Sequence, residues 1–302
     1  MNTNKRFLII GITSAIVIIA IISFSFFICA YTSVHNISSN EKGRFINRQD
    51  SVVIKKPIKH DTLLVVNNHN VIIKVCPHRK KGTFLVLHGW NLPADDWCTK
   101  TSLCSKVLEK GYDIVMPDMG KSVYHEHNYP ETNPEWRTCP TRKWLSDTLI
   151  PILQKDYALL IASENNYIVG LSTGARGVAL VLLDFPSLFK GAAAFSGDYD
   201  QTKMQTDYLV TGYYGPYETF KDRWINQDNP ITRIKEYKTP IYLGHGKLDQ
   251  IVPPEQTVMF YDSLKKYHPE LKIKLSMPDG QHDYYYWDSE VDNFLKFFGI
   301  LQ

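Results

Sequence analysis

A serine flanked by glycines follows a short apolar stretch near the middle of the 302-residue chain. Ser172 is the central residue of a Gly-x-Ser-x-Gly pattern between Gly170 and Gly174. The glycines remove side chains that would collide where a strand turns into a helix, so the backbone can hold the serine in a strained turn with its hydroxyl exposed. The pattern predicts a nucleophile; a small residue at the end of a strand is the plain alternative.

A carboxylate and an imidazole follow the serine, each after a later apolar stretch. Asp249 lies after the stretch 240–244 and before two prolines, and His282 lies in the loop after the stretch 271–277. The carboxylate can orient the imidazole, and the imidazole can accept the serine proton. A turn-capping aspartate and an exposed loop histidine are the alternatives. The order Ser172, Asp249, His282 is the order that the α/β-hydrolase arrangement requires.

Two backbone N–H groups complete the predicted site. The stretch 83–87 is followed by His88, Gly89 and Trp90, and the N–H of Trp90 beside that of Thr173 would stabilise the oxyanion of a tetrahedral intermediate. We expect His88 to support this loop and not to act in the reaction, because the chain order requires a histidine after Asp249.

Strand-like and helix-like segments alternate along most of the chain, as a mainly parallel sheet with helices on both faces requires. The expected strands are 62–67, 71–76, 83–89, 112–118, 167–170, 191–197, 240–246 and 271–277. The expected helices are 97–108, 143–155, 173–183, 254–267 and a last one ending near Phe298. Residues 119–140 are expected to form a long loop, and residues 198–237 an aromatic-rich insertion. We therefore expect one α/β domain over residues 51–302.

Three segments carry a resemblance to a known family. They are VGLSTGARGVALVLLDFPSLFKGAAAFSGDYD, GHGKLDQIVPPEQT and GQHDYYYWDSEVDNFLKFFG. Together they resemble the branch of α/β hydrolases that includes tributyrin-type esterases and relatives of S-formylglutathione hydrolase, over about residues 83–300. The resemblance implies an α/β-hydrolase fold and hydrolysis of an ester or thioester through an acyl-enzyme, with no metal and no cofactor. The chain departs from the family at Thr173–Arg176, where a methionine and paired glycines are common; Arg176 either alters the pocket or faces outward.

Two other functions are compatible with these motifs. An acyltransferase of the same fold would pass the acyl group to a sugar or lipid alcohol, and a non-catalytic protein would use the fold for binding. A nucleic-acid partner is not expected, because the net charge is only +3 and no basic run is interleaved with aromatic residues.

The N-terminus predicts a membrane anchor. Residues 7–31 contain no charged side chain and follow Lys5 and Arg6, which is the length of a membrane-spanning helix and longer than the apolar part of most cleaved signal peptides. The flanking charges favour a cytoplasmic N-terminus. We expect residues 1–31 to be a signal-anchor, residues 32–50 a polar tether, and the catalytic domain to lie outside the cytoplasm, in the periplasm or extracellular space.

Several other side chains have more than one interpretation. Outside the cytoplasm, disulfides can form, and four cysteines could pair in three ways or remain buried thiols: Cys76, Cys98, Cys104 and Cys139. His125 and His127 have a spacing seen in metal sites, but we expect exposed loop residues. The aromatic residues at 208, 213, 214, 217 and 224 could cover a substrate pocket or form core.

Overall fold

The structure is a computed structural model that describes residues 58–137 and 139–302. Eight strands form one sheet in the order β1-β2-β4-β3-β5-β6-β7-β8. β1 and β2 pair antiparallel, as do β2 and β4, and all the remaining pairs are parallel. The strands are β1 (Thr62–Val66), β2 (His69–Lys74), β3 (Gly82–Leu87), β4 (Tyr112–Pro117), β5 (Asn166–Leu171), β6 (Phe189–Phe195), β7 (Ile241–Gly244) and β8 (Ile273–Ser276).

Helices connect these strands. The α-helices are α1 (Asp96–Lys100), α2 (Leu103–Glu109), α3 (Thr141–Trp144), α4 (Ile150–Tyr157), α5 (Thr173–Asp184), α6 (Tyr208–Tyr214), α7 (Lys221–Trp224), α8 (Glu255–Tyr267), α9 (Tyr284–Ser289) and α10 (Val291–Phe297). A π-helical turn, η2 (Leu145–Leu149), joins α3 to α4, and short 3₁₀ turns are η1 (Pro134–Trp136), η3 (Gln201–Lys203) and η4 (Pro230–Glu236). This is the expected α/β architecture.

Alternate residues of the central strands bury side chains on opposite faces of the sheet, as the pleat requires. Leu85 and Leu87 of β3 belong to a core cluster that contains residues of α4, α5 and α8. Phe84 and Val86 belong to a second cluster that contains residues of α1, α2, α9 and α10. Both faces of the sheet are therefore covered by helices, which explains why β3, β4 and β5 are continuous runs of buried residues.

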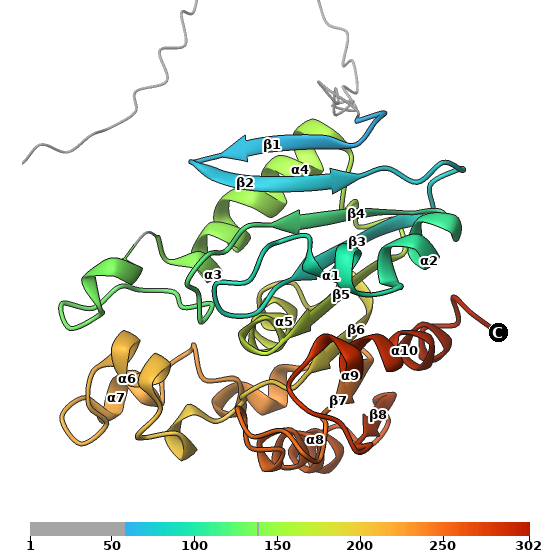
Figure 1. Ribbon diagram of the computed structural model, residues 1–302. Helices are drawn as coiled ribbons and strands as arrows, with labels where there is room; N and C mark the ends of the chain where they lie inside the picture. Colours follow the sequence, from blue (N-terminus) through green and yellow to red (C-terminus); the bar gives the residue numbers. More distant parts are fainter. Residues whose placement is uncertain (1–57, 138) are drawn as a thin grey trace, which may run out of the picture. The chain divides into compact units, whose positions relative to one another are not determined.

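The register brings the strand ends that carry the candidate residues to one edge. Gly170 of β5 pairs with Leu87 of β3 and with Ala194 of β6, while Gly244 of β7 pairs with Phe195 and Ser276. The loops that follow β3, β5, β7 and β8 consequently leave the sheet side by side. In Figure 1 the arrow of β4 points toward the side of the domain on which α6 and α7 lie.

Some boundaries differ from those expected. The first hairpin turns at Asn67 and Asn68, whose φ values are 48° and 66°, as a two-residue type I′ turn requires, so β2 begins at His69. The helix expected over 97–108 is interrupted, because Thr101 is extended and Ser102 bonds to the Asp288 carboxylate through its N–H and its hydroxyl.

The last helix is also divided, at Glu290, although this residue keeps right-handed helical backbone angles (φ −92°, ψ −9°). The segment 119–140 contains η1, and the aromatic insertion contains η3, α6, α7 and η4.

One disulfide is present among the described residues, between Cys98 of α1 and Cys104 of α2. Cys76 and Cys139 are free thiols. The structure thus contains one bond of one predicted pairing, with Cys76 and Cys139 unpaired, which is neither a complete two-disulfide pairing nor four free thiols.

Within the part of the chain that the structure describes, no helix is long and apolar enough to cross a membrane. The predicted anchor at 7–31 and the tether at 32–50 lie outside the described residues.

Candidate active site

Ser172 occupies a strained turn between β5 and α5. Its φ is 54° and its ψ is −127°, a conformation that is rare for a residue with a Cβ atom. A Cβ at Gly170 would lie 2.4 Å from the Gly174 carbonyl oxygen, and one at Gly174 would lie 2.6 Å from the carbonyl oxygens of Leu87 and His88. Both glycines are therefore required for the close approach of strand and helix, as the sequence predicted.

The loop after β3 packs directly against Ser172. A Cβ at Gly89 would lie 3.1 Å from the Cβ of Ser172, and Trp90 is the next residue. Thr173 is the first residue of α5 on the other side of the serine. The two backbone N–H groups predicted for the oxyanion therefore belong to the two segments that border Ser172.

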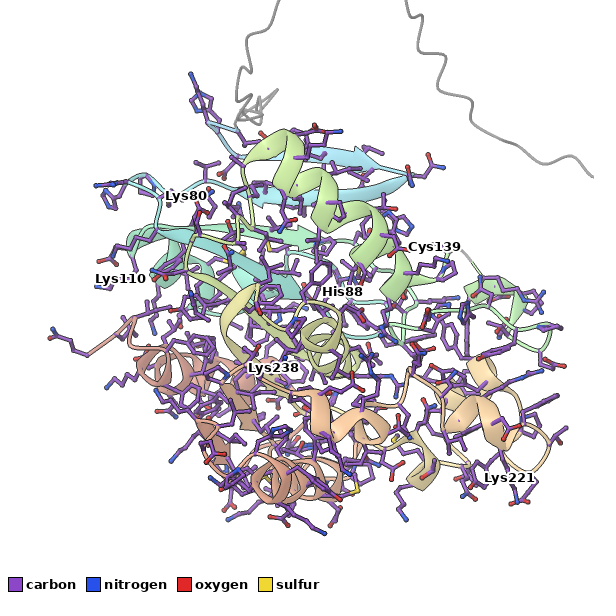
Figure 2. All side chains as sticks on the ribbon, turned by 180° about the vertical axis from the view of Figure 1, so that it is seen from behind. Lys80, His88, Lys110, Cys139, Lys221 and Lys238 are labelled. Carbon is purple, nitrogen blue, oxygen red and sulfur yellow. A yellow bond between two sulfur atoms is a disulfide. The ribbon has the colours of Figure 1, made fainter. Side chains whose placement is uncertain are left out.

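His88 holds this loop in place, as expected. Its Nε2 accepts a hydrogen bond of 2.7 Å from the Met119 N–H, and its Nδ1 donates to the Gly89 carbonyl at 2.6 Å. Burial lowers the pKa of His88, against smaller opposing effects of the Gly89 carbonyl and of Asp118. A neutral imidazole fits both bonds. Figure 2 shows His88 in the interior of the domain, far from Lys221 at the end of the insertion.

Asp249 and His282 are hydrogen bonded to each other, although 33 residues separate them. The Nδ1 of His282 donates to Oδ2 of Asp249 at 2.7 Å. The other carboxylate oxygen, Oδ1, accepts the N–H groups of Ile251 and Val252 at 2.8 and 3.0 Å. His282 also contacts the ring of Trp287 edge to face. The arrangement fixes the imidazole through Nδ1.

A second imidazole contacts the same carboxylate, which the sequence did not predict. The Nε2 of fully buried His245 lies 3.1 Å from Oδ2 of Asp249, and its Nδ1 accepts a bond of 2.6 Å from the Thr257 hydroxyl. The sequence suggested only a packing residue between two glycines, and the four-residue spacing to Asp249 was the only available signal. Burial alone would raise the pKa of Asp249, but the bonds from His245, His282 and the Val252 N–H outweigh it, so that the pKa lies below its ordinary value.

A small cavity of about 60 Å³ opens beside Ser172. The residues that border it come from β5–α5, from the insertion and from the loop of Asp249; they are Val123, Ser172, Thr173, Arg176, Asp198, Met204, Asp207, Leu209, Val210, Tyr214, Ile251 and Val252. Ile251 and Val252 are the two residues whose N–H groups bind Asp249. The cavity therefore joins the surroundings of the serine to those of the acid.

Arg176 does not face outward. Its side chain is buried and pairs with Asp198, with 2.7 Å between Nη1 and Oδ2. Its Nε donates to the Val123 carbonyl, and a further nitrogen donates to Gln201. Arg176 thus connects α5 to the insertion beneath the cavity, which explains why the chain departs from the family pattern here.

The other side chains with open interpretations are mostly core. His125 is buried against Tyr213 with its Nε2 bonded to Asn128, contrary to the expected exposed position, whereas His127 is exposed as expected. Among the described residues, no three His, Cys, Asp or Glu side chains are grouped so that they could hold a metal ion. Tyr213, Tyr214 and Trp224 form a separate buried cluster with Trp136, while Tyr208 is exposed. Of these aromatic residues, Tyr214 also borders the cavity.

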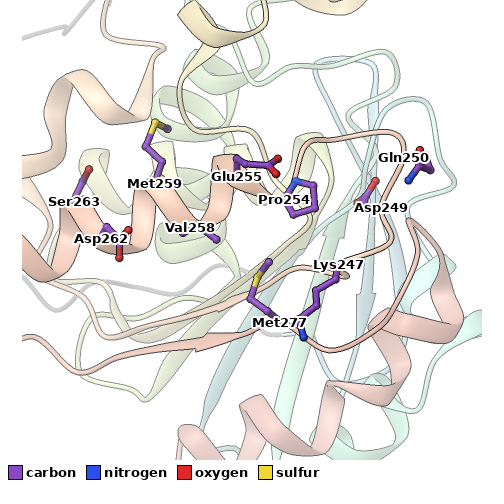
Figure 3. Close-up of a pocket in the computed structure, with 10 residues that line it drawn as sticks. All are labelled: Lys247, Asp249, Gln250, Pro254, Glu255, Val258, Met259, Asp262, Ser263 and Met277. Carbon is purple, nitrogen blue, oxygen red and sulfur yellow. The ribbon is translucent and has the colours of Figure 1, made fainter.

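A much larger hollow lies elsewhere. It has a volume of about 810 Å³ and follows α8, with Glu255, Val258, Met259 and Asp262 on one side and Met277 on another. Figure 3 shows these side chains beside Lys247 and Asp249. Ser172 is not among its lining residues, and the Asp249 carboxylate is buried behind it. We therefore take the small cavity as the candidate site, because Ser172 borders it and does not border the larger hollow.

Comparison with known protein families gives a match to the prolyl oligopeptidase family over residues 150–299, just under half of the chain. This range contains Ser172, Asp249 and His282. Among curated proteins, a poly(3-hydroxyoctanoate) depolymerase of Pseudomonas fluorescens is 22% identical over 209 residues. The match covers 68% of this chain and spans 66% of the length of the depolymerase, slightly less than two thirds.

Solved structures share the fold. The fluorophosphonate-binding serine hydrolase F of Staphylococcus aureus superposes with a TM-score of 0.62 at 16% identity, covering 78% of this chain and 93% of its own. An S-formylglutathione hydrolase of Agrobacterium tumefaciens superposes with a TM-score of 0.61 at 17% identity, covering 76% and 88%. These proteins agree with the resemblance found in the sequence. By its sheet order, its serine turn and these matches, the chain has the α/β-hydrolase fold.

Proposed function

We propose that this protein is a serine esterase that cleaves carboxylic esters or thioesters through an acyl-enzyme. The observation that carries the proposal is the 2.7 Å bond between His282 and Asp249, in a loop whose next residues border the cavity of Ser172. Because Nδ1 of His282 is bound to the carboxylate, Nε2 is the nitrogen left to accept a proton.

Each step assigns a role to one group. Ser172 Oγ attacks the substrate carbonyl carbon while its proton passes to Nε2 of His282, and Asp249 stabilises the imidazolium. The N–H groups of Trp90 and Thr173 stabilise the oxyanion. The carbon–oxygen or carbon–sulfur bond then breaks, and the leaving group takes the proton from His282. Water repeats the sequence on the acyl-enzyme, which releases the acid and restores Ser172.

The test is covalent labelling by a fluorophosphonate together with hydrolysis of a panel of short acyl esters and thioesters. We expect the parent protein to be labelled and active, and Ser172→Ala to lose label and at least about 10³-fold in rate while keeping its fold. The fold should survive because glycines, and not the hydroxyl, determine the turn. An active Ser172→Ala variant with native circular dichroism would rule out a serine hydrolase.

Three alternatives remain distinguishable. The prolyl oligopeptidase match favours cleavage of an amide bond by the same groups, which a peptide p-nitroanilide would reveal. An acyltransferase would form a new ester when a sugar or lipid alcohol is added, and product analysis with and without this acceptor would detect it. A binding protein of this fold would react with no fluorophosphonate.

We also propose that residues 7–31 anchor the protein in a membrane, with residues 32–50 as a tether and the domain of residues 51–302 outside the cytoplasm. The uncharged length of the segment supports this, as does the Cys98–Cys104 disulfide, because such bonds persist in oxidising compartments. Protease added to intact cells should digest the domain and leave a short membrane-protected fragment. Full-length protein in the cytosolic fraction would contradict the anchor.

A further inference from the structure

The cavity beside Ser172 has an excess of negative charge. Of the residues that border it, only Arg176, Asp198 and Asp207 are charged. Arg176 is already paired with Asp198. The Asp207 carboxylate accepts only the N–H groups of Leu209 and Val210, both through Oδ1 at 2.9 Å. Within the described residues, the Asp207 carboxylate therefore makes no direct ion pair, and its nearest cationic influence is Arg176, which is bonded to Asp198.

The surroundings of Asp207 disfavour its ionised form unless a cation binds in the cavity. Burial is the main cause that raises the pKa of Asp207, and repulsion from Asp198 adds to it, while the bonds from Val210 and Leu209 and a smaller attraction to Arg176 act in the opposite direction. A cation bound between the two carboxylates would offset both effects.

A buried hydroxyl without a partner borders the same cavity. Thr173 is only 6% exposed, and its Oγ1 has no hydrogen-bond partner among residues 58–137 and 139–302. A buried polar group without a partner is destabilising unless a ligand or water satisfies it. Thr173 follows the nucleophile directly, so a group that bonds to its hydroxyl would belong to a substrate held at Ser172.

We propose that this cavity binds a primary ammonium group of the substrate, an inference that rests on the proposed esterase function. An ammonium has three N–H donors and no acceptor, and the cavity offers acceptors from Asp198, Asp207 and Thr173. Apolar side chains complete the lining, among them Val123 and Val210, and would contact the carbon atoms next to the nitrogen. The volume of about 60 Å³ accommodates a group of only a few non-hydrogen atoms.

The ammonium can belong to either part of the ester. If the cavity holds the acyl part, the substrate is an ester of a short amino acid; if it holds the alcohol part, the substrate is an ester of a short amino alcohol. Both supply the same chemistry to Asp207. A hydroxyl-bearing acyl group would satisfy Thr173 but would leave the charge of Asp207 uncompensated, so the charge favours the ammonium.

The experiment compares isosteric esters that differ in charge. For the acyl part these are glycine ethyl ester and ethyl propionate; for the alcohol part they are 2-aminoethyl acetate and propyl acetate, at mildly acidic pH where acyl migration is slow. Because an ammonium group also raises the intrinsic reactivity of the ester, each kcat/KM is first divided by the hydroxide rate constant of the same ester, and this corrected ratio is the one compared between variants. We expect it to be at least about 10-fold higher for the ammonium ester in one pair, as one charged hydrogen bond predicts. The pair that shows the preference identifies the part of the substrate that enters the cavity.

The matched variants are Asp207→Asn and Asp222→Asn. Asparagine still caps α6, so Asp207→Asn removes the charge but keeps the cap, and we expect the corrected ratio of kcat/KM within the pair to fall to near one. Asp222 lies exposed on α7, away from the cavity, and its asparagine variant should keep the parent ratio. Three results would overturn the ammonium site. They are equal corrected rates within both pairs, a preference that survives Asp207→Asn, and a higher corrected rate for ethyl glycolate than for glycine ethyl ester.

A binding measurement separates this inference from the proposed function. Propylammonium chloride should raise the Tm of the parent more than n-propanol does at equal concentration and ionic strength, and Asp207→Asn should lose this difference. A Tm difference without any ester hydrolysis would leave the ammonium site standing and the esterase proposal wrong. Hydrolysis without a Tm difference or an ammonium preference would reject the site alone.

Discussion

At the scale of single residues, the site depends on groups held in unfavourable states by their neighbours. Ser172 has a φ of 54°, which costs on the order of 1–3 kcal/mol for a non-glycine residue. Its N–H donates to the Phe195 carbonyl at 2.8 Å, and its carbonyl accepts from Ala175 at 2.9 Å. Asp249 is buried, but four hydrogen bonds keep it ionised. Both residues are thus positioned before a substrate arrives.

The roles of Asp249 and His282 can be tested together. Asp249→Asn should leave KM nearly unchanged but lower the acylation rate by on the order of 10³ to 10⁴, because the amide no longer stabilises the imidazolium. His282→Ala should lose about as much rate as Ser172→Ala. The double variant should lose little more than His282→Ala, because residues that act as one proton-transfer unit are not additive.

Stopped-flow acylation rates of the two single variants and the double variant decide the matter. Fully additive losses, or an Asp249→Asn variant as fast as the parent, would assign the acid role to another carboxylate.

At the scale of elements, the site depends on how closely α5 approaches β3. Gly174, in the first turn of α5, faces the carbonyl oxygens of Leu87 and His88. The same approach places Gly89 against Ser172 and gives the loop of Trp90 its position. The insertion depends on α5 as well, since the Arg176 side chain extends from this helix to Asp198 and Gln201. α5 is therefore the element to which the other parts of the site are attached.

Gly174→Ala should separate these elements. The added Cβ would lie 2.6 Å from two carbonyl oxygens, so we expect a loss of about 1–3 kcal/mol in the free energy of unfolding, the usual cost of overpacking. The rate should also fall, because the Thr173 and Trp90 N–H groups would move apart. Urea unfolding and ester hydrolysis measure the two effects. Tyr285→Ala, at a side chain that is 89% exposed on α9, is the control, and a Gly174→Ala variant as stable as this control would contradict the packing argument.

At the scale of the whole molecule, the candidate catalytic groups and the predicted anchor belong to separate parts of the chain. Among the described residues, the eight strands between Thr62 and Ser276 already form one sheet that is covered by helices on both faces. The domain of residues 51–302 should therefore fold without the N-terminal segment.

We expect a fragment of residues 51–302 to be soluble without detergent, to unfold cooperatively and to keep the kcat/KM of the full-length protein. The full-length protein should sediment with membranes, because only it carries the apolar segment. Thermal unfolding, ester hydrolysis and membrane sedimentation of both proteins provide the measurements. An aggregated or inactive fragment would mean that the domain extends further toward the N-terminus.

The sequence by itself determined the kinds of elements, their order and the residues at the strand ends. Apolar runs such as 83–87 and 112–117 are buried strands, and the glycines around Ser172 indicated the tight turn that the structure contains. These features could be predicted because hydrophobic periodicity and turn residues are local properties of the chain. The family resemblance implied an α/β-hydrolase fold, but the order of the strands in the sheet comes from the structure.

Only the tertiary structure decided which distant side chains meet. His245 contacts Asp249 because a turn folds back onto β7, and Asp207 borders the cavity of Ser172 because the insertion returns to α5. Other features also depend on partners elsewhere in the chain or across a turn. These are the helix break at Thr101, the disulfide between Cys98 and Cys104, and the burial of Arg176 and His125. A sequence pattern records what each residue prefers locally, whereas hydrogen bonds and ion pairs between remote residues depend on the packing of the complete domain.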